Sequence, residues 1–130
     1  MSENVTLINQ EESEKDLPEQ LPCEALWQLE HAGERPNILD VREQDEWDAG
    51  HIEWATHLPL SNVREQVEKI FPNKNELIIS CCASGGRSAK AVDIMKELGY
   101  TNVKNLIGGY TGYCGREDNP EEMLSDEEGA

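Results

Sequence analysis

Two adjacent cysteines, Cys81 and Cys82, stand directly before a glycine pair and an arginine in this chain of 130 residues. They follow the apolar run 77–79, and a segment with helical spacing begins near Arg87. The order of strand, tight loop and helix start directs successive backbone N–H groups inward, at the positive end of a helix dipole. A cysteine held there has a stabilised thiolate. The segment therefore predicts a sulfur nucleophile.

The nucleophile can be placed in two registers. Counted from Cys81, the loop has the Cys-x5-Arg-Ser spacing of phosphatases and arsenate reductases, which bind a tetrahedral oxyanion. The glycine that normally stands third after the cysteine would then be Ser84, whereas counting from Cys82 places Gly85 there. Adjacent side chains of a strand point in opposite directions, so only one of the two thiols can face the loop. The count favours Cys82 and leaves Cys81 as the alternative.

Strands and helices must alternate around this loop to hold it at the edge of a sheet. After the loop, apolar positions three and four residues apart predict a helix with one apolar face. Alternation over about 100 residues predicts a small doubly wound α/β domain with a mainly parallel central sheet flanked by helices. In such a sheet the ligand lies outside the carboxyl ends of the strands. The apolar face after the loop consists of Ala91, Ile94, Met95 and Leu98.

The remaining elements are expected from apolar runs, proline and glycine. A helix is expected over 21–30, a polar bend over 42–48, and a second helix that Ser61 caps and that ends at Pro72. The inward residues of that second helix are expected to be Val63, Val67, Ile70 and Phe71. The expected strands are 37–41, 55–60, 76–81 and 103–107, and a glycine turn at 108–109 leads to a short helix over 110–116.

Acidic residues are concentrated at the two ends of the chain. The whole chain has 27 acidic and 11 basic residues and a net charge of −16. We expect an acidic N-terminal arm over 1–20, with a candidate edge strand at Val5–Ile8, a folded domain over 21–116, and an acidic flexible C-terminal tail over 117–130. The tail is expected to keep the chain in solution or to steer a basic partner protein, and it would not attract an anionic donor.

Composition also excludes several classes of function. A nucleic-acid-binding protein needs a basic face, and the excess of acidic residues in this sequence predicts none. No run approaches the roughly 18 apolar residues that a membrane span needs, and the N-terminus has no signal-peptide pattern. We therefore expect a cytoplasmic protein that binds neither nucleic acid nor membrane. The cysteine spacing matches no zinc pattern, so neither a metal nor a cofactor is expected.

Three motifs follow one another along the chain. They are Leu39-Asp40-Val41-Arg42 with Glu46-Trp47 and Gly50-His51-Ile52, then Cys82-Ala83-Ser84-Gly85-Gly86-Arg87-Ser88, and then Asn105-Leu106 with Gly108-Gly109-Tyr110. In this order they resemble the signatures of the rhodanese family, and specifically its single-domain sulfurtransferases. The resemblance covers the chain from about Leu21 to Tyr113 and is carried by several motifs together, which makes it more specific than any one motif.

The resemblance implies a rhodanese-like sulfurtransferase. Cys82 would take a sulfane sulfur from a donor such as thiosulfate, hold it as a persulfide, and pass it to a thiol or cyanide. Arg87 would offset the negative charge of the donor. A thioredoxin-like or other protein is a further candidate acceptor. The loop that holds the sulfur would consist of Ala83, Ser84, Gly85, Gly86, Arg87 and Ser88.

Several other residues near these motifs have expected supporting roles. Asp40, Arg42 and Glu46 are expected to form an ion-pair network that positions the loop. His51 is expected to stabilise a turn rather than to act as a base, because a thiolate with a lowered pKa needs none. Cys114 follows the last strand and is either a packing thiol or a resolving thiol.

The motifs leave three hypotheses about function. The first is the sulfurtransferase, in which Cys81 and Cys114 are possible resolving thiols. The second is an oxyanion reductase or phosphatase that uses Cys81. The third is a non-catalytic rhodanese-like module that binds a partner; an intact cysteine, glycine pair and arginine argue against it.

Overall fold

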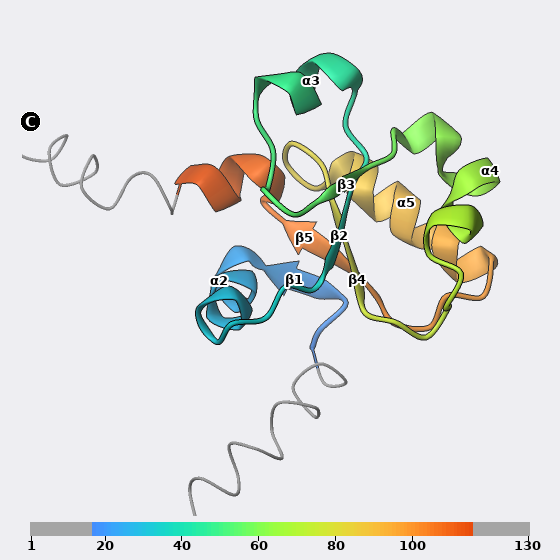
Figure 1. Ribbon diagram of the computed structural model, residues 1–130, viewed down its shortest axis with the longest axis horizontal. Helices are drawn as coiled ribbons and strands as arrows, with labels where there is room; N and C mark the ends of the chain where they lie inside the picture. The colour runs from blue at the N-terminus through green and yellow to red at the C-terminus, as the bar shows by residue number, and fades with distance from the viewer. Residues whose placement is uncertain (1–16, 116–130) are drawn as a thin grey trace, which may run out of the picture.

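A five-stranded, all-parallel sheet is the centre of the computed structural model, which describes residues 17–115 (Figure 1). The strand order is β1-β5-β4-β2-β3, and every neighbouring pair is parallel. This confirms the predicted α/β class with its parallel sheet, and the candidate strand Val5–Ile8 lies outside the described residues. The strands are β1 (Gln20–Pro22), β2 (Asn37–Asp40), β3 (Thr56–His57), β4 (Ile78–Cys81) and β5 (Val103–Ile107).

Helices cover both faces of the sheet (Figure 1). They are α2 (Cys23–His31), α3 (Gln44–Ala49), α4 (Leu60–Ile70) and α5 (Gly86–Glu97), and residues 109–115 are also helical. α4 and α5 pack on one face, and α2 packs on the other face together with the helix over 109–115. α3 follows β2 and lies near the carboxyl ends of the strands (Figure 1).

The hydrophobic core lies in two layers because strand side chains alternate between the two faces. In β4, Ile78 belongs to the layer under α4 and α5, and Ile79 belongs to the layer under α2. The alternation continues to the end of the strand. Cys81 lies in the α2 layer and Cys82 lies in the α4 and α5 layer. Burying two apolar layers, at about 25 cal/mol per Å² of apolar surface, provides the main driving force for this fold.

The first strand and helix differ from the prediction, because a helix was expected from Leu21. Leu21 and Pro22 are instead strand residues, and α2 begins at Cys23. β1 pairs with β5 over three residues, with Leu21 opposite Leu106. A strand of three residues shows no periodicity that a sequence can reveal, and its pairing partner is more than 80 residues away.

α3 and α4 also differ in detail from the prediction. The polar segment after β2 is a short helix rather than a bend, because Glu43 and Glu46 form a capping box at its start. Ser61 is not the cap of α4, since this helix begins at Leu60 after Pro59. Of its expected inward residues, Val63, Val67 and Phe71 are buried, but Ile70 is 37% exposed.

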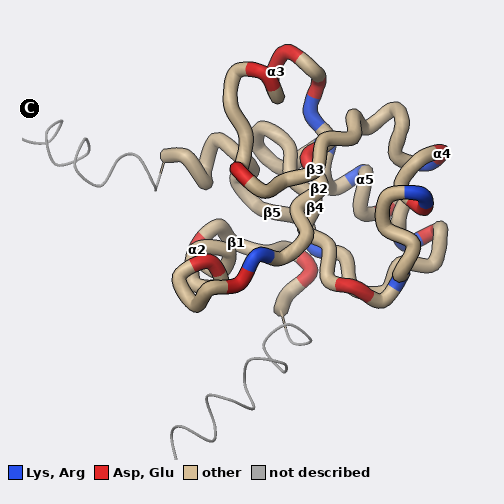
Figure 2. Tube along the Cα trace, viewed as in Figure 1, with Lys and Arg blue, Asp and Glu red and all other residues tan. Residues whose placement is uncertain are grey.

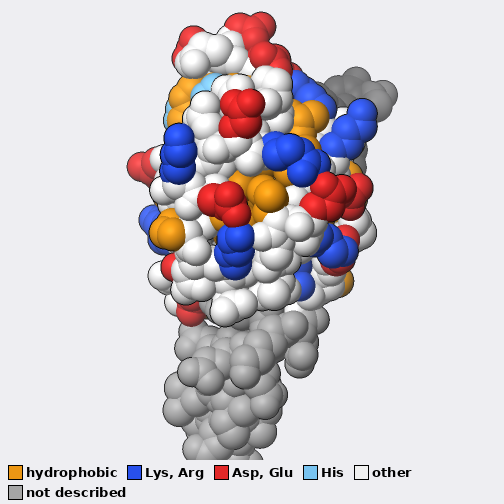
Figure 3. Space-filling view, turned by 90° about the vertical axis from the view of Figure 1, so that its right-hand side faces the viewer, with side chains coloured by type: hydrophobic (Ala, Val, Ile, Leu, Met, Phe, Trp, Pro, Cys, Tyr) orange, Lys and Arg blue, Asp and Glu red, His pale blue; other side chains and the backbone are white. Residues whose placement is uncertain are grey.

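The face formed by α4 and α5 carries charges of both signs (Figure 3). Arg64 of α4 lies 2.7 Å from Glu97 of α5, and both side chains are more than half exposed. Mixed charges of this kind form no continuous basic surface, and an exposed pair contributes little to stability.

None of the helices within residues 17–115 combines the length and the apolar character that crossing a bilayer requires.

Candidate active site

The Cys82 loop, defined here as residues 82–87, joins the carboxyl end of β4 to the first turn of α5. Cys82 is 1% exposed, and the backbone N–H of Gly85 donates a hydrogen bond to its Sγ at 3.0 Å. Gly85 has a φ of +121°, a conformation that residues with a Cβ rarely adopt. A glycine at this position therefore allows the loop to direct the Gly85 N–H group at the Cys82 sulfur.

Hydrogen bonding lowers the pKa of the Cys82 thiol. Burial alone would raise this pKa, but hydrogen bonding from Ser88 and from the N–H groups of Gly85 and Ser84 outweighs it. The start of α5 adds the positive end of a 12-residue helix. The site therefore favours the thiolate, which is the nucleophilic form of cysteine.

A pH profile of alkylation tests whether the folded protein favours the thiolate form of Cys82. The folded protein stabilises the deprotonated form, so alkylation of Cys82 by iodoacetamide is expected to stay fast below the ordinary thiol pKa of about 8.5 and to fall only at lower pH. The rate at Cys82 is measured by peptide mass mapping, with an unfolded sample as the reference. A midpoint equal to that of the unfolded chain would contradict the assignment.

Cys81 has the opposite environment. Its side chain is fully buried in the α2 layer, and its Sγ donates to the Cys82 carbonyl oxygen at 3.6 Å. Burial, together with the nearby carboxylate of Asp40, raises the pKa of this thiol far above its ordinary value. Cys81 is therefore protonated and faces away from the loop.

The first turn of α5 is fixed to two neighbouring strands. Ser88 is fully buried, and its hydroxyl donates to Oδ1 of Asn105 on β5. Ser80 of β4 donates to the carbonyl oxygen of Ser88 at 3.1 Å, and Asn105 in turn donates to Gln20 of β1 at 2.9 Å. Sequence reasoning identified Asn105 only as part of a motif and did not find Gln20, because β1 was not predicted.

The helix over 109–115 holds the loop from the other side. The N–H of Tyr110 donates to the Cys82 carbonyl oxygen at 2.7 Å, and that of Thr111 donates to Ala83 at 3.1 Å. Cys114 is half-buried and lies about one turn further along this helix than Tyr110. The contacts to the loop therefore come from the first residues of this helix, about one turn before Cys114.

Asp40 and Arg42 form a buried ion pair at the carboxyl end of β2. Their side chains are 1% and 6% exposed, and Arg42 donates through both Nε and Nη2 to the Asp40 carboxylate. Arg42 also donates to the carbonyl oxygen of Gly50 at 2.7 Å and lies 4.5 Å from the centre of the Tyr110 ring. This pair connects β2 with the end of α3 and with the helix that holds the loop.

Glu46 has a different partner from the one expected. The sequence suggested that it joins Asp40 and Arg42, but its carboxylate accepts two hydrogen bonds from Arg87 of the Cys82 loop, at 2.8 and 2.9 Å. The guanidinium of Arg87, expected to offset the charge of a donor, is therefore already paired with a carboxylate. Figure 2 shows the acidic residues that α3 carries near the carboxyl ends of the strands.

His51 stabilises the segment after α3. Its Nδ1 donates to the carbonyl oxygen of Trp47 at 2.9 Å, and its ring stacks on the Trp47 ring with centroids 3.4 Å apart. His57 stacks on the same indole at 4.8 Å and donates to the carbonyl oxygen of Arg42 at 2.8 Å. Both imidazoles thus support the polypeptide that carries Glu46.

Cys23, the remaining cysteine, packs beside β5 and the helix over 109–115. Its Sγ donates to the Ile107 carbonyl oxygen at 3.3 Å, and burial raises the pKa of the thiol. Among residues 17–115, no group of three or more His, Cys, Asp or Glu side chains is placed to hold a metal ion.

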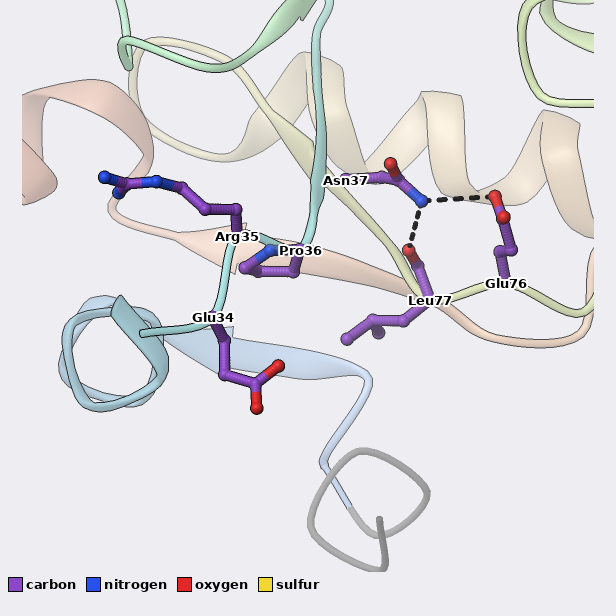
Figure 4. Close-up of a pocket in the computed structure, with 6 residues that line it drawn as sticks. All are labelled: Glu34, Arg35, Pro36, Asn37, Glu76 and Leu77. Atoms are coloured by element: carbon purple, nitrogen blue, oxygen red, sulfur yellow. Dashed lines mark hydrogen bonds between the residues drawn. The ribbon is translucent and has the colours of Figure 1, made fainter. Parts of the chain in front are cut away.

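A pocket lies at the opposite edge of the sheet from the Cys82 loop (Figure 4). Asn37 begins β2 there, and it donates to the Glu76 carboxylate and to the Leu77 carbonyl oxygen, both at 3.2 Å. The length of a four-residue strand, about 13 Å, separates this edge from the carboxyl ends. The residues that line the pocket are Glu34, Arg35, Pro36, Asn37, Glu76 and Leu77.

Comparison with known proteins gives a family for this arrangement. The rhodanese-like domain model matches residues 23–116. The chain is 35% identical over 107 residues to the putative sulfur carrier protein YrkF of Bacillus subtilis; the match covers 82% of this chain and 56% of YrkF, so the chain spans little more than half of that relative. It is 34% identical over 70 residues to the thiosulfate sulfurtransferase PspE of Escherichia coli, covering 54% of this chain and 67% of PspE.

A solved structure extends the likeness to three dimensions. The rhodanese-like domain protein from Staphylococcus aureus superimposes with a TM-score of 0.64 and 26% identity, covering 74% of this chain and 91% of that one. The predicted parallel sheet with flanking helices is therefore the architecture of this family.

Proposed function

We propose that this chain, which belongs to the rhodanese-like family, is a sulfurtransferase that carries sulfur as a persulfide on Cys82. One observation carries the proposal. The Sγ of Cys82 accepts a backbone hydrogen bond at 3.0 Å in a loop whose hydrogen bonds lower the pKa of the thiol. A thiolate held in this way can attack a sulfane sulfur without a general base.

The proposed reaction with thiosulfate takes place in two steps. The Cys82 thiolate attacks the outer sulfur of thiosulfate, the S–S bond of the donor breaks with its electron pair on the leaving group, and sulfite departs. The loop N–H groups stabilise the persulfide anion that remains. A thiolate or cyanide then attacks the outer sulfur, which leaves as a persulfide or thiocyanate and returns the Cys82 thiolate.

The relatives support a sulfur-transfer role of this kind. PspE is named a thiosulfate sulfurtransferase and YrkF a putative sulfur carrier protein. Candidate partners are therefore a small sulfur donor and a thiol, cyanide or thioredoxin-like acceptor. The proposed location is the cytoplasm, since free cysteines persist in a reducing compartment. The proposed working unit is the domain over 21–116, with acidic segments on either side.

Two alternative functions receive less support. An oxyanion reductase or phosphatase based on Cys81 would need a thiolate in the loop, but the Cys81 thiol is buried in the opposite layer and its pKa is raised. A module that only binds a partner would need neither the lowered pKa of Cys82 nor the N–H group of Gly85 directed at its sulfur.

Intact mass after incubation with thiosulfate tests the proposal. The full chain is expected to gain one sulfur atom, about 32 Da, which peptide mapping places on Cys82. A cyanide chase should remove this mass and release thiocyanate. The absence of an adduct, together with hydrolysis of a phosphate ester, would contradict the proposal and support the Cys81 alternative.

Cys114→Ser is expected to leave the release of sulfur from the persulfide unchanged, within about twofold. The physical reason is that the residues of this helix that contact the loop are Tyr110 and Thr111, about one turn before Cys114. Release is measured as thiol-dependent loss of the added mass, beside the wild-type chain. Slower release, with loss of an intramolecular disulfide seen in the wild type, would instead make Cys114 a resolving thiol.

A further inference from the structure

Within residues 17–115, two arginines at the carboxyl edge of the sheet, Arg42 and Arg87, are each paired with a carboxylate. Arg42 is paired with Asp40 in the buried ion pair described above. Arg87 lies in the Cys82 loop itself and is paired through two nitrogens with the two oxygens of Glu46. A two-point pairing of this geometry fixes the direction of the guanidinium as well as its charge.

Glu46 is held in place independently of Arg87. It is the third residue of α3, and one of its oxygens also accepts a hydrogen bond from the N–H of Glu43 at 2.9 Å. Hydrogen bonding from Arg87, and next from the Glu43 backbone, lowers the pKa of Glu46 from 4.5 to about 2. The carboxylate is therefore charged wherever the Cys82 thiolate is.

The charge balance around the sulfur follows from these pairs. Arg87 brings one positive charge and Glu46 one negative charge, and Glu43 adds a further negative charge close enough to act on Arg87. Among the residues that the structure describes, the positive field that remains at Cys82 comes from the loop N–H groups and the start of α5. Lys90 is exposed about one turn further along α5, outside this pairing. Such a site suits a persulfide with one negative charge better than a dianion.

We propose that Glu46 is a specificity-determining residue of this site. By neutralising Arg87, it favours sulfur donors with at most one negative charge, such as persulfides of thiols, over dianionic thiosulfate. In that reaction the Cys82 thiolate forms an S–S bond to the outer sulfur of R–S–SH, and the donor S–S bond breaks with its electron pair on R–S⁻. The proton of the outer sulfur then passes to solvent, which leaves the Cys82 persulfide anion. The inference rests on the proposed sulfurtransferase function and names the donor class of its site.

Charge selectivity at Cys82 can be measured without any sulfur transfer. Iodoacetate and iodoacetamide are similar in size and react with the same thiolate, but only iodoacetate is negatively charged. The ratio of their rates at Cys82, followed by peptide mapping at one pH, cancels the thiolate fraction. In Glu46→Gln, the iodoacetate-to-iodoacetamide ratio is expected to rise about tenfold, the effect of one charge-assisted contact with the uncovered Arg87.

The variants are chosen to separate charge from structure. Glutamine keeps the size of the side chain and an oxygen for the Glu43 N–H, so α3 should keep its start. Glu46→Ala serves as a second variant if the first unfolds, because alanine suits a helix. Glu97→Gln makes the same change in net charge at the exposed pair with Arg64 and should leave the ratio within about twofold of wild type. An unchanged ratio in the folded Glu46 variants would overturn the proposal.

Thiosulfate provides the second arm of the test. In Glu46→Gln, the KM for thiosulfate in persulfide formation is expected to fall about tenfold, while the rate at saturating donor changes little. If the wild type takes no sulfur from thiosulfate or from a thiol persulfide, the proposed function is wrong, and the alkylation ratio still tests the role of Glu46. If sulfur transfer occurs but neither ratio nor KM changes, the role of Glu46 is wrong and the function stands.

Discussion

Cys82→Ser is expected to abolish the uptake of sulfur from thiosulfate, measured as the gain of one sulfur in the intact mass and as sulfite release. A serine hydroxyl is not ionised at neutral pH, whereas the lowered pKa of the Cys82 thiol favours the thiolate that the proposed reaction needs. The substitution changes one buried atom, so the free energy of unfolding is expected to change by only about 1 kcal/mol. Lost activity in a folded protein then reports on chemistry.

Cys81→Ala is the matched control for this prediction. Cys81 lies one residue away but in the layer under α2, so its replacement should keep sulfur uptake and cost about 1 kcal/mol of stability through lost packing. Uptake that persisted in Cys82→Ser and disappeared in Cys81→Ala would make Cys81 the nucleophile and would contradict the assigned register.

Gly109→Ala is expected to displace the Cys82 loop and to lower both stability and activity. Gly109 has a φ of +56°, and an added Cβ would lie 2.7 Å from the carbonyl carbon and oxygen of Ala83 and closer still to the Cys82 carbonyl oxygen. Because these are backbone atoms, the helix or the loop must shift and the hydrogen bond from Tyr110 must lengthen. We expect a loss of about 3 kcal/mol in the free energy of unfolding and a slower persulfide formation.

Gly33→Ala separates backbone strain from this steric contact. Gly33 also has a positive φ, of +88°, but an added Cβ would have no heavy atom within 4 Å. Its replacement should cost about 1 kcal/mol and leave sulfur uptake unchanged. Urea unfolding and the intact-mass assay give both quantities for the two variants. Equal losses of stability and of sulfur uptake in the two variants would contradict a steric role for the contact between Gly109 and the loop.

Features that depend on neighbouring residues could be predicted from the sequence. Strand alternation alone placed Cys81 and Cys82 on opposite faces, and the structure has them in different layers of the core. The apolar spacing after the loop predicted α5, and Ala91 and Met95 are indeed fully buried. These features are local, since a period of two or of 3.6 residues is set by backbone geometry wherever the segment lies in the fold.

Contacts between distant segments could not be predicted from the sequence. Glu46 and Arg87 were both identified, yet their pairing across 41 residues depends on where α3 lies relative to α5. Likewise, β1 is defined by its pairing with β5, and Gly109 is required by a carbonyl group of a loop 27 residues earlier. Apolar alternation and the loop motif thus predicted the parallel α/β fold and the position of the Cys82 loop at the edge of its sheet. The charge that this loop presents to a donor could not be predicted in this way, because it depends on the pairing of Arg87 with Glu46 of α3. Such a pairing forms only when distant segments pack together, and the periodicity of a segment does not indicate which distant residue it will contact.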